Sequence, residues 1–133
     1  MTSTRLRVSE ASTLAGVSDD TIRRWAESGR IHLIKGDSGP LTVDGAELAH
    51  LLQELSVESG LGSTARTSIR NQLVGIVTRV TKDAVMAQVD LQAGPFRIVS
   101  LISREAADEL GLEVGTVAAA TVKATSVSIS LPT

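Results

Sequence analysis

Two short stretches of this chain each combine one fixed positive charge with several hydroxyl groups. They are TSIRNQLV at residues 67–74 and VKATSVSISL at residues 122–131, and neither contains a carboxylate. A small tetrahedral oxyanion accepts hydrogen bonds and offers no protons at neutral pH, so its site should consist of donors. The alternative is that these side chains are ordinary exposed residues at strand ends. We predict an oxyanion site formed by Thr67, Ser68, Arg70, Lys123, Thr125 and Ser126.

Short strands must position these donors, because the second half of the chain is rich in Val, Ile, Thr and Ala in runs broken by glycine. A short helix should interrupt the strands, with Ser103 as its N-cap, Leu110 closing its apolar face and Gly111 ending it. Five strands and one inserted helix predict a small closed barrel of the oligomer-binding type. The predicted strands are Leu73 to Thr81, Ala84 to Leu91, Phe96 to Ile102, Thr116 to Val122 and Val127 to Leu131.

The first half of the chain has helical periodicity instead. We predict one helix over residues 10–15, capped by Ser9, and a second over residues 19–27, capped by Ser18, with Gly16 in the turn between them. Strands at 31–34 and 41–43 should form a hairpin. A third helix should begin at Asp44, with Glu47 completing a capping box and a buried stripe of Leu48, Leu51, Leu52 and Leu55.

This order of elements predicts an N-terminal winged helix-turn-helix beside the C-terminal barrel, an α+β chain overall. The composition shift places the first domain at residues 1–55 and the barrel at 67–133. Residues 56–66 are small and polar and should form a linker. Each core is small, so we expect oligomerisation to support it.

Composition restricts the function classes. The net charge of −2 argues against a globally basic nucleic-acid binder, although residues 1–35 hold six Lys/Arg against four Asp/Glu. The chain has no cysteine and no apolar run of membrane-spanning length, so we expect a cytoplasmic protein with no membrane partner. It shows no nucleophile–base–acid set, metal cluster or phosphate-cradling glycine loop. We therefore expect no catalytic residue, no metal site and no enzyme activity.

Residues 8–31 resemble the DNA-binding heads of the MerR and excisionase families. Their sequence is VSEASTLAGVSDDTIRRWAESGRI. The resemblance implies that Thr21, Arg23 and Arg24 enter the major groove and that Trp25 belongs to the core. The alternative is that Arg23 and Arg24 form an ordinary solvated helix face. The wing, GDSGPLTV, has Lys35 before it and no cation after it. The DNA-binding residues that we predict are Arg7, Thr21, Arg23, Arg24, Arg30 and Lys35.

Residues 67–132 resemble the Mop family, also called molbindins. The opening Ser68-Ile69-Arg70-Asn71 is similar to the family's Ser-Ala-Arg-Asn, and Lys123-Ala124-Thr125-Ser126-Val127 is similar to its Lys-Ala-Ser-x-Val end, with Thr125 in place of the usual serine. The resemblance implies molybdate or tungstate as bound ligand and no organic cofactor. It also implies a homo-oligomer, dimer or hexamer, with sites between subunits to which different chains contribute the two signature ends.

Three functions follow from these readings. The first is a molybdate- or tungstate-responsive transcription regulator, whose head binds a palindromic operator. The second is an intracellular molybdate store or buffer, whose first domain serves assembly. The third is an excisionase-like architectural DNA binder with a vestigial barrel.

Overall fold

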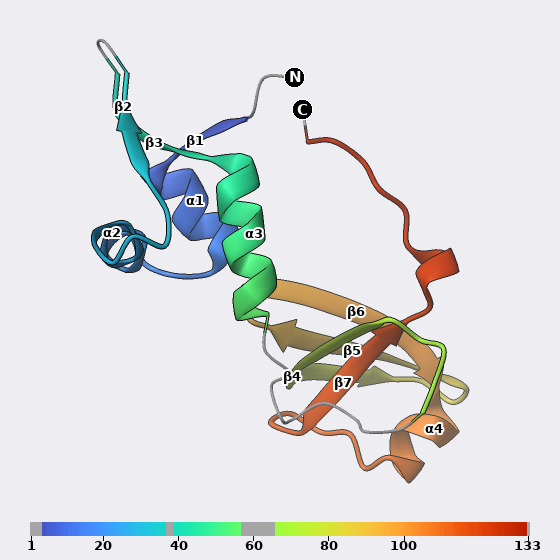
Figure 1. Cartoon of the computed structure of the whole chain (residues 1–133). Coiled ribbons are helices and arrows are strands. Elements are labelled where there is room, and N and C mark those ends of the chain that lie inside the picture. Colours follow the sequence, from blue (N-terminus) through green and yellow to red (C-terminus); the bar gives the residue numbers. More distant parts are fainter. Residues whose placement is uncertain (1–3, 37–38, 57–65, 133) are drawn as a thin grey trace. The chain divides into compact units, whose positions relative to one another are not determined.

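The computed structural model describes residues 4–36, 39–56 and 66–132. The chain forms two compact units, Met1–Val57 and Glu58–Thr133, and each is described here by itself (Figure 1). Most of the predicted linker, residues 57–65, lies outside the described residues. None of the helices in the described ranges is long and apolar enough to cross a membrane.

The first unit contains three helices and a small antiparallel sheet, with the strands in the order β1-β3-β2. The two helices, the hairpin and the third helix appear in the predicted order, with one strand before them. The elements are β1 Arg5–Arg7, α1 Val8–Ala15, α2 Asp19–Glu27, β2 Leu33–Lys35, β3 Leu41–Asp44 and α3 Gly45–Leu55.

Two of the three predicted caps in this unit are confirmed. The Ser18 hydroxyl accepts the Thr21 N–H at 3.2 Å, and the Asp44 carboxylate accepts the Glu47 N–H at 3.2 Å. The prediction of Ser9 as a cap was wrong, because α1 begins at Val8, two residues earlier than predicted, and Arg7 is its N-cap. Val8 is buried, so the apolar face of α1 extends further toward the N-terminus than the sequence pattern indicated.

The core of the first unit lies where the helices pack on the sheet. Trp25 packs against this core from α2, as predicted. In α3 the predicted stripe holds for Leu48 and Leu51, which are buried, and Leu52, which is partly buried. Leu55 is 37% exposed, because it is the last residue of the helix. The buried core residues are Val8, Ala11, Ile22, Ile31, Val43, Leu48 and Leu51.

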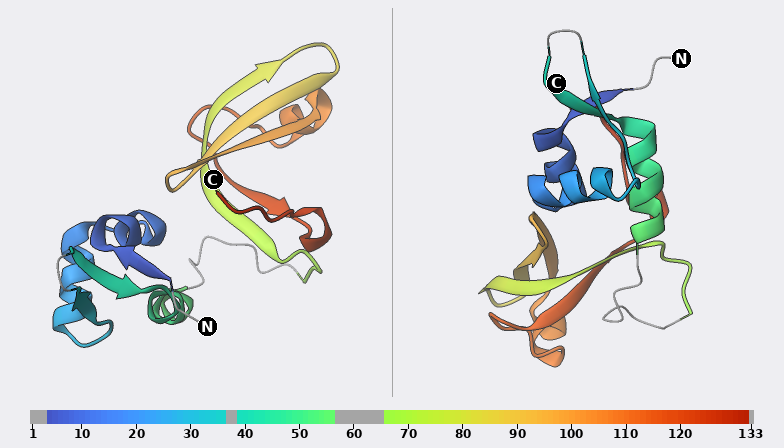
Figure 2. Two further views of the ribbon diagram at one scale, coloured as in Figure 1. Left: turned by 90° about the horizontal axis from the view of Figure 1, so that it is seen from above. Right: turned by 60° about the vertical axis from the view of Figure 1, so that its left-hand side comes forward.

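The second unit is a curled antiparallel sheet with the strands in the order β6-β5-β4-β7 (Figure 2). Its buried core is small, and consists of Val77, Val89 and Leu91. The elements are β4 Asn71–Lys82, β5 Met86–Ala93, β6 Phe96–Ser103, α4 Arg104–Glu109, β7 Val117–Val122 and the 3₁₀ turn η1 Ala124–Ser126.

The long strand β4 belongs to both halves of this curled sheet. It pairs with β7 over Asn71–Ile76 and with β5 from Ile76 onward. The register shifts between Val77 and Arg79, and such a bulge bends a strand. Gly75 permits the close approach at the bend, since a Cβ there would lie 2.3 Å from the Gln92 carbonyl oxygen.

The predictions of a fifth strand and of a closed barrel were wrong for the single chain. Residues 127–131 form no strand, so the sheet of the described residues has four strands and stays open. The turn η1 explains this outcome, because its bonds, Ser126 N–H to the Lys123 carbonyl at 2.8 Å and Val127 N–H to Ala124 at 3.2 Å, interrupt the extended chain after β7.

The short helix α4 begins as predicted, since the Ser103 hydroxyl accepts the Ala106 N–H at 3.0 Å. Its predicted apolar closure by Leu110 was wrong. Leu110 is 68% exposed, and Ala107 is the buried residue of this helix. A six-residue helix buries only the side chain that faces the sheet directly, and Leu110 follows its last turn.

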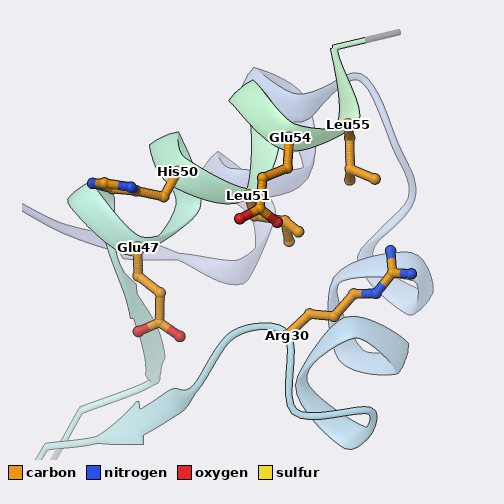
Figure 3. A pocket seen from close by; sticks show the side chains of 6 residues that line it. All are labelled: Arg30, Glu47, His50, Leu51, Glu54 and Leu55. Carbon is orange, nitrogen blue, oxygen red and sulfur yellow. The ribbon is translucent and has the colours of Figure 1, made fainter.

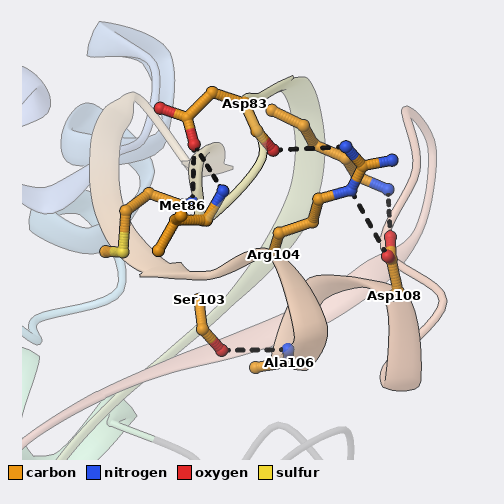
Figure 4. A network of polar contacts seen from close by, with 8 residues as sticks. Asp83, Met86, Ser103, Arg104, Ala106 and Asp108 are labelled. Atoms are coloured by element: carbon orange, nitrogen blue, oxygen red, sulfur yellow. Dashed lines mark hydrogen bonds and ion pairs between the residues drawn. The ribbon is translucent and has the colours of Figure 1, made fainter.

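Charged groups fasten α4 to the turn between β4 and β5 (Figure 4). The Asp83 carboxylate accepts the N–H groups of Met86 and Val85, and these bonds lower its pKa. Arg104 donates to the Asp83 carbonyl at 3.2 Å and lies 3.6 Å from Asp108. The Lys82 ammonium donates to Asp108 at 2.6 Å, which is the main cause of a lowered pKa for Asp108.

Strand β5 carries a buried carboxylate, Asp90. Arg97 donates two hydrogen bonds to one of its oxygens, at 2.9 and 2.7 Å, and Gln88 donates to the other at 3.2 Å. The bond from Arg97 is the largest cause of a pKa for Asp90 below its usual range, and the bond from Gln88 comes next. No pattern in the sequence singled out Asp90.

Candidate functional site

The pairing of β4 with β7 brings the two predicted oxyanion stretches together. Asn71 is opposite Val122 in this register, so Arg70 and Lys123 are neighbours at the same end of the strand pair. The Asn71 side-chain amide donates to the Val122 carbonyl at 3.1 Å and links the stretches directly. Residues 51 positions apart in the chain therefore form one cluster. Sequence reasoning placed Asn71 in the motif but did not assign it this linking contact.

The remaining predicted donors lie in the loops that leave these two strands. The Thr67 hydroxyl accepts the Ile69 N–H at 3.2 Å, which tightens the approach to β4. Thr125 and Ser126 belong to η1, for which Lys123 is the N-cap. All six predicted donors are exposed. Within one chain, these cations and hydroxyls thus lie at one end of the β4–β7 pair and are open to water.

In the first unit, two of the predicted DNA-binding cations border one hollow. Arg7 and Arg23 line it together with Ser9 and Asp19, and Pro40 and Leu41 of the hairpin complete it. Lys35 is opposite Leu41 across the hairpin, so it lies beside the same region. The structure therefore brings together residues from the start of α1, from α2 and from the hairpin.

The cations of α2 are held by neighbouring side chains on the same helix. Arg24 donates to the Thr21 hydroxyl at 3.1 Å, and the Ser18 and Thr21 hydroxyls are 3.0 Å apart. Arg23 lies 3.6 Å from the Asp20 carboxylate. Neutral groups thus position Arg24, whereas an acidic neighbour partly neutralises Arg23.

Arg30 is not brought to this hollow. It lines a different one, between the segment after α2 and helix α3 (Figure 3). Glu47 and Glu54 share that hollow with it, together with His50. Glu47 also contacts His32 Nδ1 at 2.8 Å. Two carboxylates beside Arg30 weaken any attraction for phosphate at this position.

The second unit is thus a small antiparallel sheet domain with exposed cations and hydroxyls at one end of the β4–β7 pair. Comparison with protein families gives the same segment a name, because residues 67–129 match the model of the TOBE domain. The chain is 43% identical over 63 residues to molybdenum-pterin-binding protein 3 of Clostridium pasteurianum, which covers 47% of this chain and 93% of the relative. The chain therefore belongs to the TOBE-domain family through its second unit.

Two solved structures are also similar to this segment. A molybdate-binding protein from Sporomusa ovata matches with 28% identity and a TM-score of 0.49, over 50% of this chain and 100% of the other. MopII from Clostridium pasteurianum matches with 42% identity and a TM-score of 0.47, again over 50% and 100%. The family match begins at residue 67, so the first unit lies outside it.

Proposed function

We propose that the second unit binds molybdate or tungstate as an oxyanion, as a binding protein and not as an enzyme. The observation that carries this proposal is the β4–β7 register, which makes Arg70 and Lys123 neighbours in the segment that belongs to the TOBE-domain family. The relative named as a molybdenum-pterin-binding protein supports molybdenum as the element involved.

The chemistry of the donors fits a tetrahedral dianion. Arg70 offers a forked cationic donor and Lys123 a point charge, while Ser68, Thr125 and Ser126 offer hydroxyls. Such a ligand needs no organic cofactor to be held. Because these donors are exposed in one chain, we propose that a second copy covers the site and that ligand binding favours the assembly.

Calorimetric titration of the full chain with molybdate tests this proposal, with sulfate as the competing oxyanion. Micromolar or tighter binding is expected, with weak binding of sulfate. Arg70→Ala should abolish the heat, because it removes the forked donor. Arg79→Ala is the matched control, an exposed arginine within strand β4, which begins directly after Arg70, and it should bind like the parent chain. Absence of saturation in the parent chain would refute the oxyanion proposal.

We further propose that the first unit is a winged helix-turn-helix head that binds DNA, which would make the protein an oxyanion-responsive regulator. Three observations support this: the order of two helices, hairpin and third helix; the hollow shared by Arg7 and Arg23 with the hairpin; and the hydroxyl-held Arg24 on α2. A recognition helix carries such residues into the major groove while flanking cations contact phosphates.

The regulatory step would be a shift in population between arrangements of the subunits. Two heads on a palindromic operator must present their recognition helices about 34 Å apart, or at a multiple of it. An oxyanion that favours one arrangement of the second units would change that spacing and hence the affinity for DNA.

Fluorescence anisotropy with a labelled DNA duplex at low salt tests the head, because a cationic face binds any duplex there through phosphates. Arg24→Ala should weaken binding clearly, whereas Arg30→Ala should weaken it least, since Arg30 shares its hollow with two glutamates. Adding molybdate should change the affinity of the parent chain. Equal losses in the two variants would contradict the proposed orientation of the head.

A second candidate function is an intracellular molybdate store whose first unit serves assembly. The pairing of Arg23 with Asp20, the acidic hollow around Arg30 and the net charge of −2 favour it. The two functions separate in one measurement. Molybdate binding without any DNA binding at low salt would select the store.

A further inference from the structure

Two carboxylates begin helix α2, in the same unit as the cations that we expect to contact DNA. Asp19 and Asp20 are the first two residues of this helix, and Ser18 is its N-cap. Negative charge on a face that approaches phosphates weakens the attraction for any duplex. The two side chains differ in what they contact, and this difference indicates a separate use for each.

Asp19 is held by a side chain inside the first unit. Ser12 is a buried residue of α1, and its hydroxyl donates to Asp19 Oδ1 at 2.6 Å. A hydrogen bond between a hydroxyl and a carboxylate at this distance is short and strong. It joins α1 to the start of α2. The carboxylate of Asp19 therefore has a use in the fold, which is to connect the first two helices.

Asp20 points into solvent instead. Its side chain is 87% exposed, and among the described residues its charged partner is Arg23, whose Nη1 lies 3.6 Å from Asp20 Oδ1. An exposed pair of this kind contributes little to stability. The helix dipole favours a carboxylate in the first turn, but it favours Asp19 and Asp20 alike. Neither contact accounts for a second carboxylate on this face.

The position of Asp20 on α2 groups it with residues that we expect to face the major groove. Residues four apart lie on the same face of a helix, so Asp20 and Arg24 are neighbours on one face. Thr21, whose hydroxyl accepts a hydrogen bond from Arg24 at 3.1 Å, lies beside them. In a recognition helix the N-terminal residues are the ones that contact base edges. A carboxylate at position 20 can therefore meet a base, where it affects the choice of sequence.

The chemistry of a carboxylate restricts the base that it can select. An ionised carboxylate only accepts hydrogen bonds. In the major groove guanine and thymine present acceptors, whereas cytosine N4 and adenine N6 are donors. Adenine also places its acceptor N7 beside N6, and this atom repels a carboxylate. Cytosine is therefore the base that suits Asp20.

We propose that Asp20 is a specificity-determining residue, which accepts a hydrogen bond from the N4 amino group of a cytosine in the operator. The carboxylate lowers the affinity for duplexes in general, and it lowers the affinity least where cytosine lies at the position that it faces. Asp19, held by Ser12, makes no such contact. This inference rests on the proposed DNA-binding function of the first unit and names the class of sequence that the head selects.

Selection of bound duplexes from a library with a randomised segment, followed by sequencing, tests the inference. The full chain is used, with and without molybdate. Sequences selected by the parent chain should share a cytosine at one fixed position of each half-site. Asp20→Asn should change the preferred base at that position from cytosine to adenine, because an amide side chain bonds to adenine N6 and N7 together. Asp20→Ala should leave the position without a preference.

Asp19→Asn is the matched control, because it removes the same charge one residue away and its amide oxygen can still accept from Ser12. Both asparagine variants should bind a duplex of random sequence more tightly than the parent chain, since each removes one negative charge. Replacing the selected cytosine by adenine should weaken binding about tenfold for the parent chain and for Asp19→Asn. The same replacement should strengthen binding for Asp20→Asn. Fluorescence anisotropy measures these affinities.

The outcomes separate this inference from the function on which it rests. A parent chain that binds no duplex at low salt would overturn both. Duplex binding with the same preferred bases in the parent chain and in Asp20→Asn would overturn the inference alone, and so would an equal change of preference in Asp19→Asn. A change from cytosine to adenine confined to Asp20→Asn supports it. A variant that fails to fold cannot gain a preference for adenine, so this result does not depend on stability.

Discussion

The two units differ in how completely one chain covers their cores. In the first, helices close over a three-stranded sheet, and Ile22, Ile31 and Val43 are fully buried. In the second, four strands and one six-residue helix leave large apolar side chains such as Leu101 and Val117 more than 60% exposed. Helices that pack on a sheet bury the apolar side chains beneath them, whereas a sheet without such a layer must close on itself to bury its apolar face. One chain therefore covers the core of the first unit more completely than that of the second.

The sole tryptophan makes this comparison measurable. Trp25 packs against the core of the first unit, so its fluorescence reports the unfolding of that unit. Far-UV circular dichroism reports the strands of the second unit as well. Two units of this kind can unfold separately, so the two signals need not coincide.

The largest effect is expected from truncating the closed core. Ile22→Ala removes a fully buried side chain and should lower the free energy of unfolding of the first unit by about 2–5 kcal/mol. Ile129→Ala, at dilutions where the chain is monomeric, should change the stability of the second unit by no more than about 0.5 kcal/mol. Urea unfolding followed by Trp25 fluorescence and circular dichroism measures both. Equal losses would remove the distinction between the two units.

A smaller effect is expected where backbones approach closely. Gly75→Ala places a methyl group against the Gln92 carbonyl, and β4 and β5 must separate to admit it, so a loss of about 1–3 kcal/mol is expected in the second unit. Gly45→Ala is the counterpart in the first unit, where the methyl would lie 3.1 Å from the Thr4 carbonyl and a small shift suffices. Thermal melts of both variants should show the larger loss for Gly75→Ala, and the reverse order would show that the bend of β4 tolerates a side chain.

The helix caps test whether the units are independent. Ser18→Ala and Ser103→Ala each remove one acceptor for a helix N–H and should cost about 1 kcal/mol. Hydrogen exchange should accelerate at Thr21 in the first variant and at Ala106 in the second. Loss of protection in the opposite unit would mean that the two cores unfold together.

The smallest change in stability is expected for Asp90, and it appears only at acid pH. The bond from Arg97, followed by that from Gln88, lowers the folded pKa of Asp90 below its ordinary value of 3.8. The stability that this carboxylate contributes is therefore complete above the ordinary value, and is lost as the pH falls from there through the folded pKa. Circular dichroism in urea at decreasing pH should show this loss in the second unit. Asp90→Asn should flatten the dependence, and an unchanged slope would assign the acid sensitivity to other groups such as Asp83 and Asp108.

Much of the local structure could be predicted from the sequence, because its causes lie within a few residues. Ser18, Asp44 and Ser103 each begin a helix by accepting an N–H three positions on. Four of the five predicted strands form, because alternation of apolar residues is a property of the strand itself. The donor types of the oxyanion site could likewise be read directly, whereas their function stays a prediction.

Contacts between distant residues could not be predicted in the same way. Three such contacts connect separate elements. Asn71 bonds to Val122, Asp90 bonds to Arg97, and Arg30 shares a hollow with two glutamates. The pattern of residues within one segment does not determine which distant residues it contacts. The start of α1 at Val8 instead of after Ser9 has the same origin, because the core decided which residue the first turn should bury.

The segment of residues 127–131, Val-Ser-Ile-Ser-Leu, shows where the two kinds of information separate. Its sequence determined an alternation of apolar and hydroxyl residues, which as a strand can bury only one face. Whether that segment forms a strand depends on pairing, and the tertiary structure leaves it unpaired within the described residues, because η1 turns the chain after β7. Sequence sets which surfaces a segment can bury, and only the fold determines what is present to cover them.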